Sequence, residues 1–342
     1  MKVLIIRLSS IGDVLLTTPV VRCLKKQMPD VELDYLTKRA NVEMLESSPY
    51  LRQVVVLGAD MGETIEKLRS ERYDYIIDLH NNHRSRRIRR ALRVKCKVYR
   101  KENLRKFIYI FTKRNVMSGR HVVDRYFGAV NVFGVKNDGE GLDFFLPKEL
   151  EGSFSANLKW NDISVGQILQ EPYIAIACGA QHMTKRIPVQ YILELCNMLQ
   201  FSVVLLGDGR DMEELEAYST QFPPNVVNLC GKTTLTQSAL LVREAAVLIS
   251  SDTGLMHMGA AFKRPVLAVW GATAPPLGFT PYKTEYYSFE VKDLHCHPCS
   301  RQGGERCRKG HFKCMNCQNW RSVALKAEEI VTRKDFNGEK TI

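Results

Sequence analysis

The chain has 342 residues, of which 45% are hydrophobic and 25% charged, and its formal net charge is +12. This length exceeds what one hydrophobic core usually serves, so we expect two domains. No apolar run is long enough to span a bilayer, and the run before Arg7 is too short for the core of a signal peptide. We therefore expect a cytoplasmic protein.

The first half of the chain alternates short apolar strands with helical patterns. The predicted strands are 2–6, 32–36, 53–57, 74–79 and 97–100, and the predicted helices are 19–27, 41–47, 61–70 and a basic helix from about residue 84. Single helices between parallel strands predict a doubly wound sheet. Thr18 is the expected N-cap of the first helix, with Pro19 at its first position. Residues 12–17 would then form a loop that exposes Asp13.

The periodicity lapses over residues 146–172, which we interpret as a linker. It resumes with predicted strands 173–178, 202–207, 226–231, 246–250 and 265–271 and predicted helices 189–200, 211–220, 235–245 and 254–262. The expected fold class is α/β, with domains at 1–160 and 171–318 and a C-terminal helix in 319–342 that packs back on the body. Two facing doubly wound sheets would bind ligands in the cleft beyond the carboxyl ends of their strands.

One segment makes the chain basic. Residues 84–125 hold 16 Lys and Arg against two acids, Glu102 and Asp124, and the rest of the chain is close to neutral. This asymmetry predicts an anionic partner, either nucleic acid, anionic lipid, or a phosphorylated or carboxylated substrate.

Five of the ten cysteines lie close together near the C-terminus. They are Cys296, Cys299, Cys307, Cys314 and Cys317. Their spacing is typical of a zinc site, and clustered thiols in a cytosolic protein favour metal over disulfide. Structural zinc and free thiols are the alternatives, and of the two we favour free thiols.

Two strand ends carry polar, glycine-containing sequences, SSIGD at 9–13 and SSDTGLMHMGAA at 250–261. In the second, Asp252 closes a strand, and the helix that follows presents free amides that favour a phosphate. Lys185, near another strand end, would complete an anion site. The chain contains no complete dinucleotide fingerprint, P-loop or GxSxG motif, which disfavours hydride transfer and serine hydrolysis.

In chain order, RLSSIGDVLLTTPVVRCLKKQMPD, YDYIIDLHNNHRSR, CGAQHMTKRIP, LLGDGRD and SDTGLMHMGAAFKRPVLAVWGAT resemble glycosyltransferase family nine, the lipopolysaccharide heptosyltransferases and their relatives. The resemblance implies the GT-B fold, two facing Rossmann-like domains with the active site in the interdomain cleft. It also implies an inverting, metal-independent transfer from a nucleotide-diphosphate sugar, ADP-heptose first, to an anionic lipopolysaccharide core. The expected location is the cytoplasmic face of the inner membrane.

The resemblance also implies roles for individual residues. Asp13 matches the general base, which removes a proton from the acceptor hydroxyl. The donor site matches Lys185, Asp252, Thr253 and Gly254, whose charge and amides would stabilise the departing diphosphate, and His257 is a further candidate. The family's Trp in the lysine motif is Ile187 here, and its threonines are Ala180 and Gln181, so the donor sugar stays open. Candidate acceptor contacts are Ser10, Gly12, Asn81, Arg84, Arg120 and Arg125.

Two alternatives remain. A related transferase could use another nucleotide sugar and acceptor. A basic zinc-ribbon protein that binds nucleic acid would explain the basic segment and the cysteines, but it leaves SSIGD and SDTGL without a role, and no RNP, KH or helix-turn-helix pattern supports it. We therefore expect no nucleic acid, and we assign the basic segment to the anionic acceptor and the anionic membrane surface.

Overall fold

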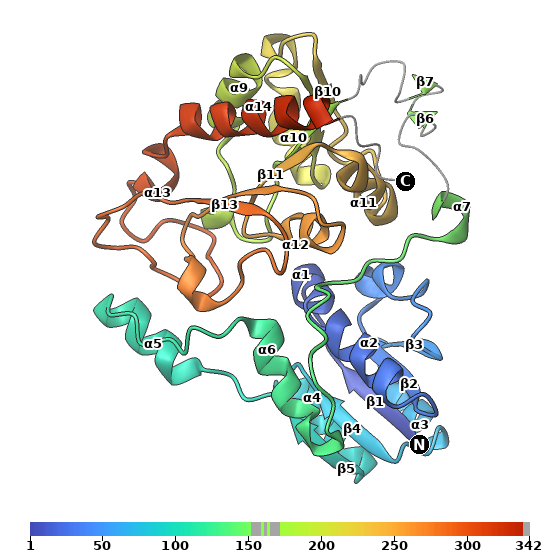
Figure 1. Ribbon diagram of the computed structural model, residues 1–342. Helices are drawn as coiled ribbons and strands as arrows, with labels where there is room; N and C mark the ends of the chain where they lie inside the picture. The colour runs from blue at the N-terminus through green and yellow to red at the C-terminus, as the bar shows by residue number, and fades with distance from the viewer. Residues whose placement is uncertain (152–158, 161–162, 165–171, 338–342) are drawn as a thin grey trace. The chain divides into compact units, whose positions relative to one another are not determined.

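The computed structural model describes residues 1–151, 159–160, 163–164 and 172–337 (Figure 1). The predicted linker, residues 146–172, lies largely outside these residues. The chain divides into two compact units, Met1–Glu102 with Arg120–Lys148, and Asn103–Gly119 with Glu149–Ile342. Segment Asn103–Gly119 therefore belongs with the second unit, although the sequence interpretation placed it in the first domain.

The first unit contains a five-stranded parallel sheet in the order β3-β2-β1-β4-β5, drawn in blue and cyan in Figure 1. Its strands are β1 Lys2–Ile6, β2 Glu32–Thr37, β3 Gln53–Val56, β4 Tyr75–Asp78 and β5 Lys95–Val98. Its α-helices are α1 Ile11–Leu15, α2 Thr18–Gln27, α3 Met61–Ser70, α4 His83–Leu92 and α6 Val122–Tyr126, and its 3-10 helices are η1 Arg39–Met44, η2 Phe127–Ala129 and η3 Asn131–Phe133. Helix α7 Lys148–Glu151 begins at the last residue of this unit and continues into the second. The predicted doubly wound sheet is confirmed.

The stretch around Asp13 differs from the predicted loop. It contains the short helix α1, because the Asp13 carboxylate accepts hydrogen bonds from the backbone amide and the hydroxyl of Ser10, at 3.3 and 3.2 Å, and so closes its first turn. The next helix, α2, has Thr17 rather than Thr18 as its N-cap. Asp13 therefore lies on a helix turn rather than in a loop.

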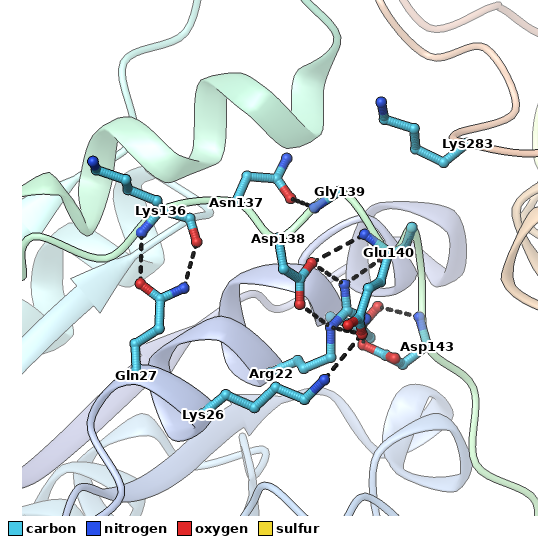
Figure 2. A network of polar contacts seen from close by, with 12 residues as sticks. Arg22, Lys26, Gln27, Lys136, Asn137, Asp138, Gly139, Glu140, Asp143 and Lys283 are labelled. Carbon is cyan, nitrogen blue, oxygen red and sulfur yellow. Dashed lines mark hydrogen bonds and ion pairs between the residues drawn. The ribbon is translucent and has the colours of Figure 1, made fainter.

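A buried arginine attaches α2 to the last part of the first unit. The Arg22 guanidinium donates to both carboxylate oxygens of Asp138 at 2.8 Å and to Gly141 O at 2.9 Å, and it pairs with Asp143 (Figure 2). Burying an arginine is costly unless its donors are satisfied, and here each guanidinium nitrogen has an acceptor. These contacts hold the loop that follows α6 against the first sheet's helical layer.

The second unit contains a six-stranded parallel sheet in the order β10-β9-β8-β11-β12-β13. Its strands are β8 Tyr173–Ala177, β9 Ser202–Leu206, β10 Val226–Asn228, β11 Val247–Ser251, β12 Val266–Val269 and β13 Tyr286–Phe289, and a separate antiparallel pair joins β6 Lys159–Trp160 to β7 Ile163–Ser164. The sequence did not predict β13. This strand lies at the sheet edge, is half exposed, and lacks the continuous apolar run of its neighbours.

The helices of the second unit are α5 Asn103–Thr112, α9 Val189–Met198, α10 Gly209–Glu216, α11 Leu235–Glu244, α12 Gly254–Ala261, α13 Lys313–Asn316 and α14 Trp320–Asn337, with 3-10 helices η5 Met183–Lys185, η6 Ser219–Gln221 and η7 Pro275–Leu277. The C-terminal helix α14, red in Figure 1, packs on α9, β8 and β11. In the described part of the chain, no helix is both long and apolar enough to cross a membrane.

The strand orders locate a ligand-binding edge in each sheet. In the first sheet the winding reverses between β1 and β4, and in the second it reverses between β8 and β11. Open parallel sheets bind ligands beyond the carboxyl ends of the strands at such switch points, because the connecting helices there turn to opposite faces. The residues that follow these four strands are therefore the candidate site residues.

Candidate functional site

At the switch point of the first sheet, Asp13 is held by a buried arginine. Its Oδ1 lies 2.7 Å from Arg7 Nη2, while its Oδ2 accepts the two hydrogen bonds from Ser10. The other donors of Arg7 go to Ser9 O at 3.1 Å and Leu79 O at 2.6 Å, so Arg7 also joins the ends of β1 and β4. Although burial opposes its charge, the adjacent Asp13 raises the pKa of Arg7 above the ordinary value. Asp13 thus has a fixed orientation and remains 24% exposed.

His80 is a site residue that the sequence interpretation missed. It follows β4, and its Nδ1 is buried with no hydrogen-bond partner among the described residues. Burial, together with the positive charges of Arg7 and Lys101, lowers the pKa of His80 to about 4, so the ring is neutral at physiological pH. The available signal was its place directly after a strand in DLHNN, beside the predicted Asn81.

The predicted acceptor contacts of the first unit fall into two groups. Ser10, Gly12 and Asn81 lie at the ends of β1 and β4. Asn81 has a left-handed backbone, with φ of 49°, and its side-chain amide donates to Tyr99 O at 2.9 Å. Gly12 is buried within α1 and contributes backbone rather than a contact surface.

The three predicted arginines differ in accessibility. Arg84 is exposed on α4, and Arg120 is exposed while donating to Asp124 O at 2.9 Å. Arg125 is buried and pairs with Glu102 at 2.8 Å. Because its charge is already compensated inside the unit, the geometry favours a structural role for Arg125 over the predicted acceptor contact.

At the switch point of the second sheet, Lys185 and Asp252 form an ion pair. Lys185 follows β8 and Asp252 follows the neighbouring β11, and Lys185 Nζ lies 2.9 Å from Asp252 Oδ2. Thr273, after β12, donates its hydroxyl to the same oxygen at 2.9 Å. Thr273 is a second residue that the sequence did not single out. The segments that follow three neighbouring strands thus bring one ammonium and one hydroxyl to the same carboxylate oxygen.

The helix that follows Asp252 begins beside this ion pair. Thr253 is the N-cap of α12 and Gly254 its first residue, and in the described part of the chain the Thr253 side chain forms no capping hydrogen bond. Free amides at a helix start favour an anion. His257 is buried in the same helix, which favours packing over the predicted donor contact.

The predicted departures from the family motif lie on both sides of Lys185, with Ala180 and Gln181 before it and Ile187 after it. Ala180 and Gln181 are in the loop after β8, and Gln181 is exposed. Ile187 is buried in the hydrophobic core of the second unit. An aliphatic side chain at this position therefore packs inward and offers no ring to a donor.

The cysteine-rich loop supports Lys185. Gly303 has φ of +95°, and a Cβ there would lie 2.9 Å from the Lys185 Cδ, so only glycine permits this approach. Gly304 and Thr184 exchange two hydrogen bonds, from Thr184 N to Gly304 O at 3.0 Å and from Gly304 N to Thr184 Oγ1 at 2.8 Å. The loop is therefore part of the frame of the lysine site.

The thiols of this loop are free, as are all ten cysteines of the chain. Burial and neighbouring thiols raise the pKa of Cys299, and they raise that of Cys314 to about 12, so both are protonated at neutral pH. Among the described residues, no three His, Cys, Asp or Glu side chains are arranged to hold one metal ion.

Two glycines, Gly179 after β8 and Gly207 in LLGDGRD, have a structural explanation. A Cβ on Gly179 or Gly207 would lie 2.0 or 2.4 Å from Asp211 Oδ2, so both positions must be glycine for the buried Asp211 to fit. Asp211 pairs with Arg186 and accepts the Asp208 amide at 2.7 Å, which closes the first turn of α10. The loop therefore holds Arg186, the residue next to Lys185, in place. This packing accounts for Gly207 without a role in dinucleotide binding.

Two doubly wound parallel sheets of this size and order define a protein of the GT-B fold. Over 97% of both chains, the structure resembles that of a family 9 glycosyltransferase from Veillonella parvula, with a TM-score of 0.75 and 19% identity. It also resembles the Escherichia coli ADP-heptose LPS heptosyltransferase II, with a TM-score of 0.71 and 18% identity over 98% of this chain and all of the other.

Residues 61–309 match the sequence model of glycosyltransferase family 9 (heptosyltransferase), and the chain belongs to this family. It is therefore a glycosyltransferase. Lipooligosaccharide heptosyltransferase 2 of Haemophilus influenzae is 26% identical over 82% of this chain and 86% of its own length. Lipopolysaccharide heptosyltransferase 2 of Salmonella typhimurium is also 26% identical, over 82% and 85%.

Proposed function

We propose that this glycosyltransferase transfers a heptose from a nucleotide-diphosphate donor, ADP-heptose first, to the core of lipopolysaccharide, with inversion and without a catalytic metal. The observation that carries the proposal is the Lys185–Asp252 pair beside the start of α12, at the switch point of the second sheet. The family and the names of the relatives support the heptose and the lipopolysaccharide acceptor.

In this proposal Lys185 and the first amides of α12 bind the donor diphosphate. As the bond to the sugar breaks, negative charge grows on the diphosphate, and a fixed ammonium and helix amides stabilise that charge without reorganising. Asp252, released from Lys185 by the incoming phosphates, would accept hydrogen bonds from sugar hydroxyls. Thr273 keeps Asp252 in place during this exchange, because its hydroxyl bond does not depend on Lys185.

Asp13 is the proposed base. A carboxylate that removes the acceptor proton while the new bond forms contributes to rate, provided that it is correctly oriented. Arg7 and Ser10 supply that orientation, and the exposed part of the carboxylate is available to a substrate. Attack by the acceptor from the side opposite the diphosphate would invert the configuration at the sugar carbon.

The basic segment is the proposed contact for the anionic parts of the acceptor and for an anionic membrane surface. Arg84 and its exposed neighbours on α4 carry positive charge without acidic residues in that helix. Phosphates and carboxylates are the matching partners. We place the protein, by this argument, at the cytoplasmic face of the inner membrane.

A thermal-shift screen tests the donor assignment. ADP-heptose, other nucleotide-diphosphate sugars and ADP alone are each added to the full chain, since a ligand that binds the native state raises its melting temperature. We expect a rise with ADP-heptose, a smaller rise in Lys185→Ala, and no change of this rise in Lys292→Ala, which removes an exposed lysine elsewhere in the same unit.

Two results would change the proposal. A larger rise with another nucleotide sugar would reassign the donor, as the replacement of the family Trp and threonines by Ile187, Ala180 and Gln181 allows. No rise with any nucleotide diphosphate at millimolar concentration would overturn the donor site.

A further inference from the structure

Helix α5 presents an apolar face to solvent. Leu104, Phe107 and Phe111 are 72%, 61% and 78% exposed, and their spacing places them on one side of the helix. The rings of Phe107 and Phe111 stack, with centroids 6.0 Å apart and planes within 7°. Large contiguous apolar surfaces are rare on soluble proteins and mark sites of interaction.

The rest of the helix is attached to the second unit. Tyr109 is buried, and Lys106 Nζ lies 4.7 Å from the centroid of the Phe279 ring. Just after the helix, Lys113 Nζ donates to Pro298 O at 2.6 Å and to Cys296 O at 3.2 Å. The helix therefore already has its own packing partners, and the aromatic face is the side that these contacts leave uncovered.

The surroundings of this face are strongly basic. Within the same unit, residues 103–119 contain four bases, Arg105, Lys106, Lys113 and Arg114, and no acid. Arg105 and Arg114 are exposed, while Lys106 and Lys113 make the contacts described above. An apolar stripe bordered by lysines and arginines is typical of helices that lie in the interface of an anionic bilayer.

We propose that α5 docks the enzyme on anionic lipid, with Leu104, Phe107 and Phe111 inserted at the boundary between headgroups and acyl chains and the neighbouring bases on lipid phosphates. This inference rests on the proposed function, because it names the element that makes the membrane contact proposed there. A helix of ten residues is about 15 Å long, too short to cross the hydrocarbon core, so it lies in the plane of the surface.

The charge argues against a second copy of the chain as the occupant. Two identical faces that meet about a two-fold axis would bring two sets of bases together, with no acid in residues 103–119 to offset them. An anionic bilayer offers acyl chains to the apolar stripe and lipid phosphates to the bases.

The test is sedimentation of the full chain with vesicles. Wild type is mixed with vesicles of phosphatidylethanolamine and phosphatidylglycerol, or of phosphatidylcholine alone. We expect binding to the anionic vesicles, weakened about tenfold or more in the double variant Phe107→Ser/Phe111→Ser, since each lost ring removes apolar burial. The matched control Val132→Ser/Leu325→Ser removes two exposed apolar side chains elsewhere and should bind as wild type does.

The other outcomes are decisive. Equal binding by wild type and the Phe107→Ser/Phe111→Ser variant, or equal loss in the control, would overturn the assignment to α5. Sedimentation velocity of the protein alone that shows a dimer in wild type and a monomer in that variant would assign the face to a second copy. The donor-induced thermal shift, measured without vesicles, separates the two proposals. A normal thermal shift without vesicle binding would overturn only the assignment of α5 as the docking helix. Vesicle binding without any thermal shift would overturn only the donor assignment.

Discussion

Arg7 and Asp13 show how strongly a candidate base depends on one neighbour. Arg7 is buried, its two remaining partners are backbone carbonyls, and Asp13 is the carboxylate that balances its charge. The same ion pair that orients the proposed base therefore contributes to the stability of the first unit. Substitutions at Asp13 must be judged on both properties.

We predict that Asp13→Asn lowers turnover by about a hundredfold to ten-thousandfold, because the amide cannot accept the acceptor proton. We also expect a lower melting temperature, since Arg7 loses its charge partner, with a cost of roughly 1–3 kcal/mol. Turnover must therefore be measured at a temperature where the variant is folded. The donor-induced rise in melting temperature then checks that the donor site of the second unit is intact.

Ser10→Ala separates the orientation of the carboxylate from its ability to take up a proton, because Arg7 still holds Asp13 in this variant. It removes one hydrogen bond to Asp13 and leaves the carboxylate and the ion pair in place. Only a small loss of turnover is expected. Near-normal turnover in Asp13→Asn would return this residue to a purely structural role.

His80 predicts a stability that depends on pH. Its pKa is lowered by burial to about 4, against an ordinary value of about 6.5, so between these values the unfolded chain binds more protons than the native one. Stability is therefore full above pH 6.5 and falls as the pH drops toward 4. His80→Gln, which cannot take up this proton, should lose less melting temperature between pH 7 and pH 5 than wild type does. Parallel loss in both proteins would contradict the assignment.

At the scale of elements, the start of α10 is arranged around one buried carboxylate. Asp211 accepts the amide of the N-cap Asp208, pairs with Arg186 beside the lysine site, and fits only because residues 179 and 207 have no Cβ. Gly207, one of the two glycines that resemble part of a nucleotide-binding fingerprint, is thus explained by packing on a side chain.

We predict that Gly207→Ala destabilises the protein by about 3–5 kcal/mol, because Asp211 must move and the buried pair with Arg186 is broken. The control is Gly209→Ala, two residues further on, where a Cβ meets no atom within 4 Å among the described residues. That substitution should be neutral or stabilising by about 0.4–1 kcal/mol. Urea unfolding of both variants gives the comparison, and equal free energies of unfolding would contradict the packing argument.

At the scale of the whole molecule, the proposed functions are divided between the two units. The donor site lies in the second, and the basic helix α4 and the proposed base lie in the first. Helix α5, although it follows the basic helix in sequence, belongs with the second unit. Charge and donor binding are therefore separable by substitution.

Reversal of Arg84, Arg86 and Arg87 to Glu should impair use of a phosphorylated lipid acceptor and leave the donor-induced thermal shift unchanged. The reason is that these exposed side chains are on α4, while the donor contacts follow β8 and β11. The same three reversals at Lys38, Arg39 and Arg72, which are exposed elsewhere in the first unit, control for net charge. Equal loss of acceptor use in both triple variants would show that the site on α4 is not specific.

The local pattern of the sequence was sufficient for most of the architecture. Strand and helix periods are properties of short windows, so the alternation that builds both sheets, including helix 61–70, was predictable. The strand ends near Asp13, Lys185 and Asp252 were predictable for the same reason, because the segments that follow buried parallel strands lie at the ligand-binding edge of the sheet.

Features that depend on contacts between residues far apart in the sequence could be known only from the tertiary structure. The bond from Arg7 to Leu79 O spans 72 residues, and the hydrogen bond from Thr273 to Asp252 joins the ends of neighbouring strands. The burial that lowers the pKa of His80, the carboxylate that requires Gly207, and the uncovered face of α5 arise in the same way. A sequence window contains neither the partner nor the solvent exposure of a side chain, and those two quantities decide its charge, its packing and its availability to a ligand.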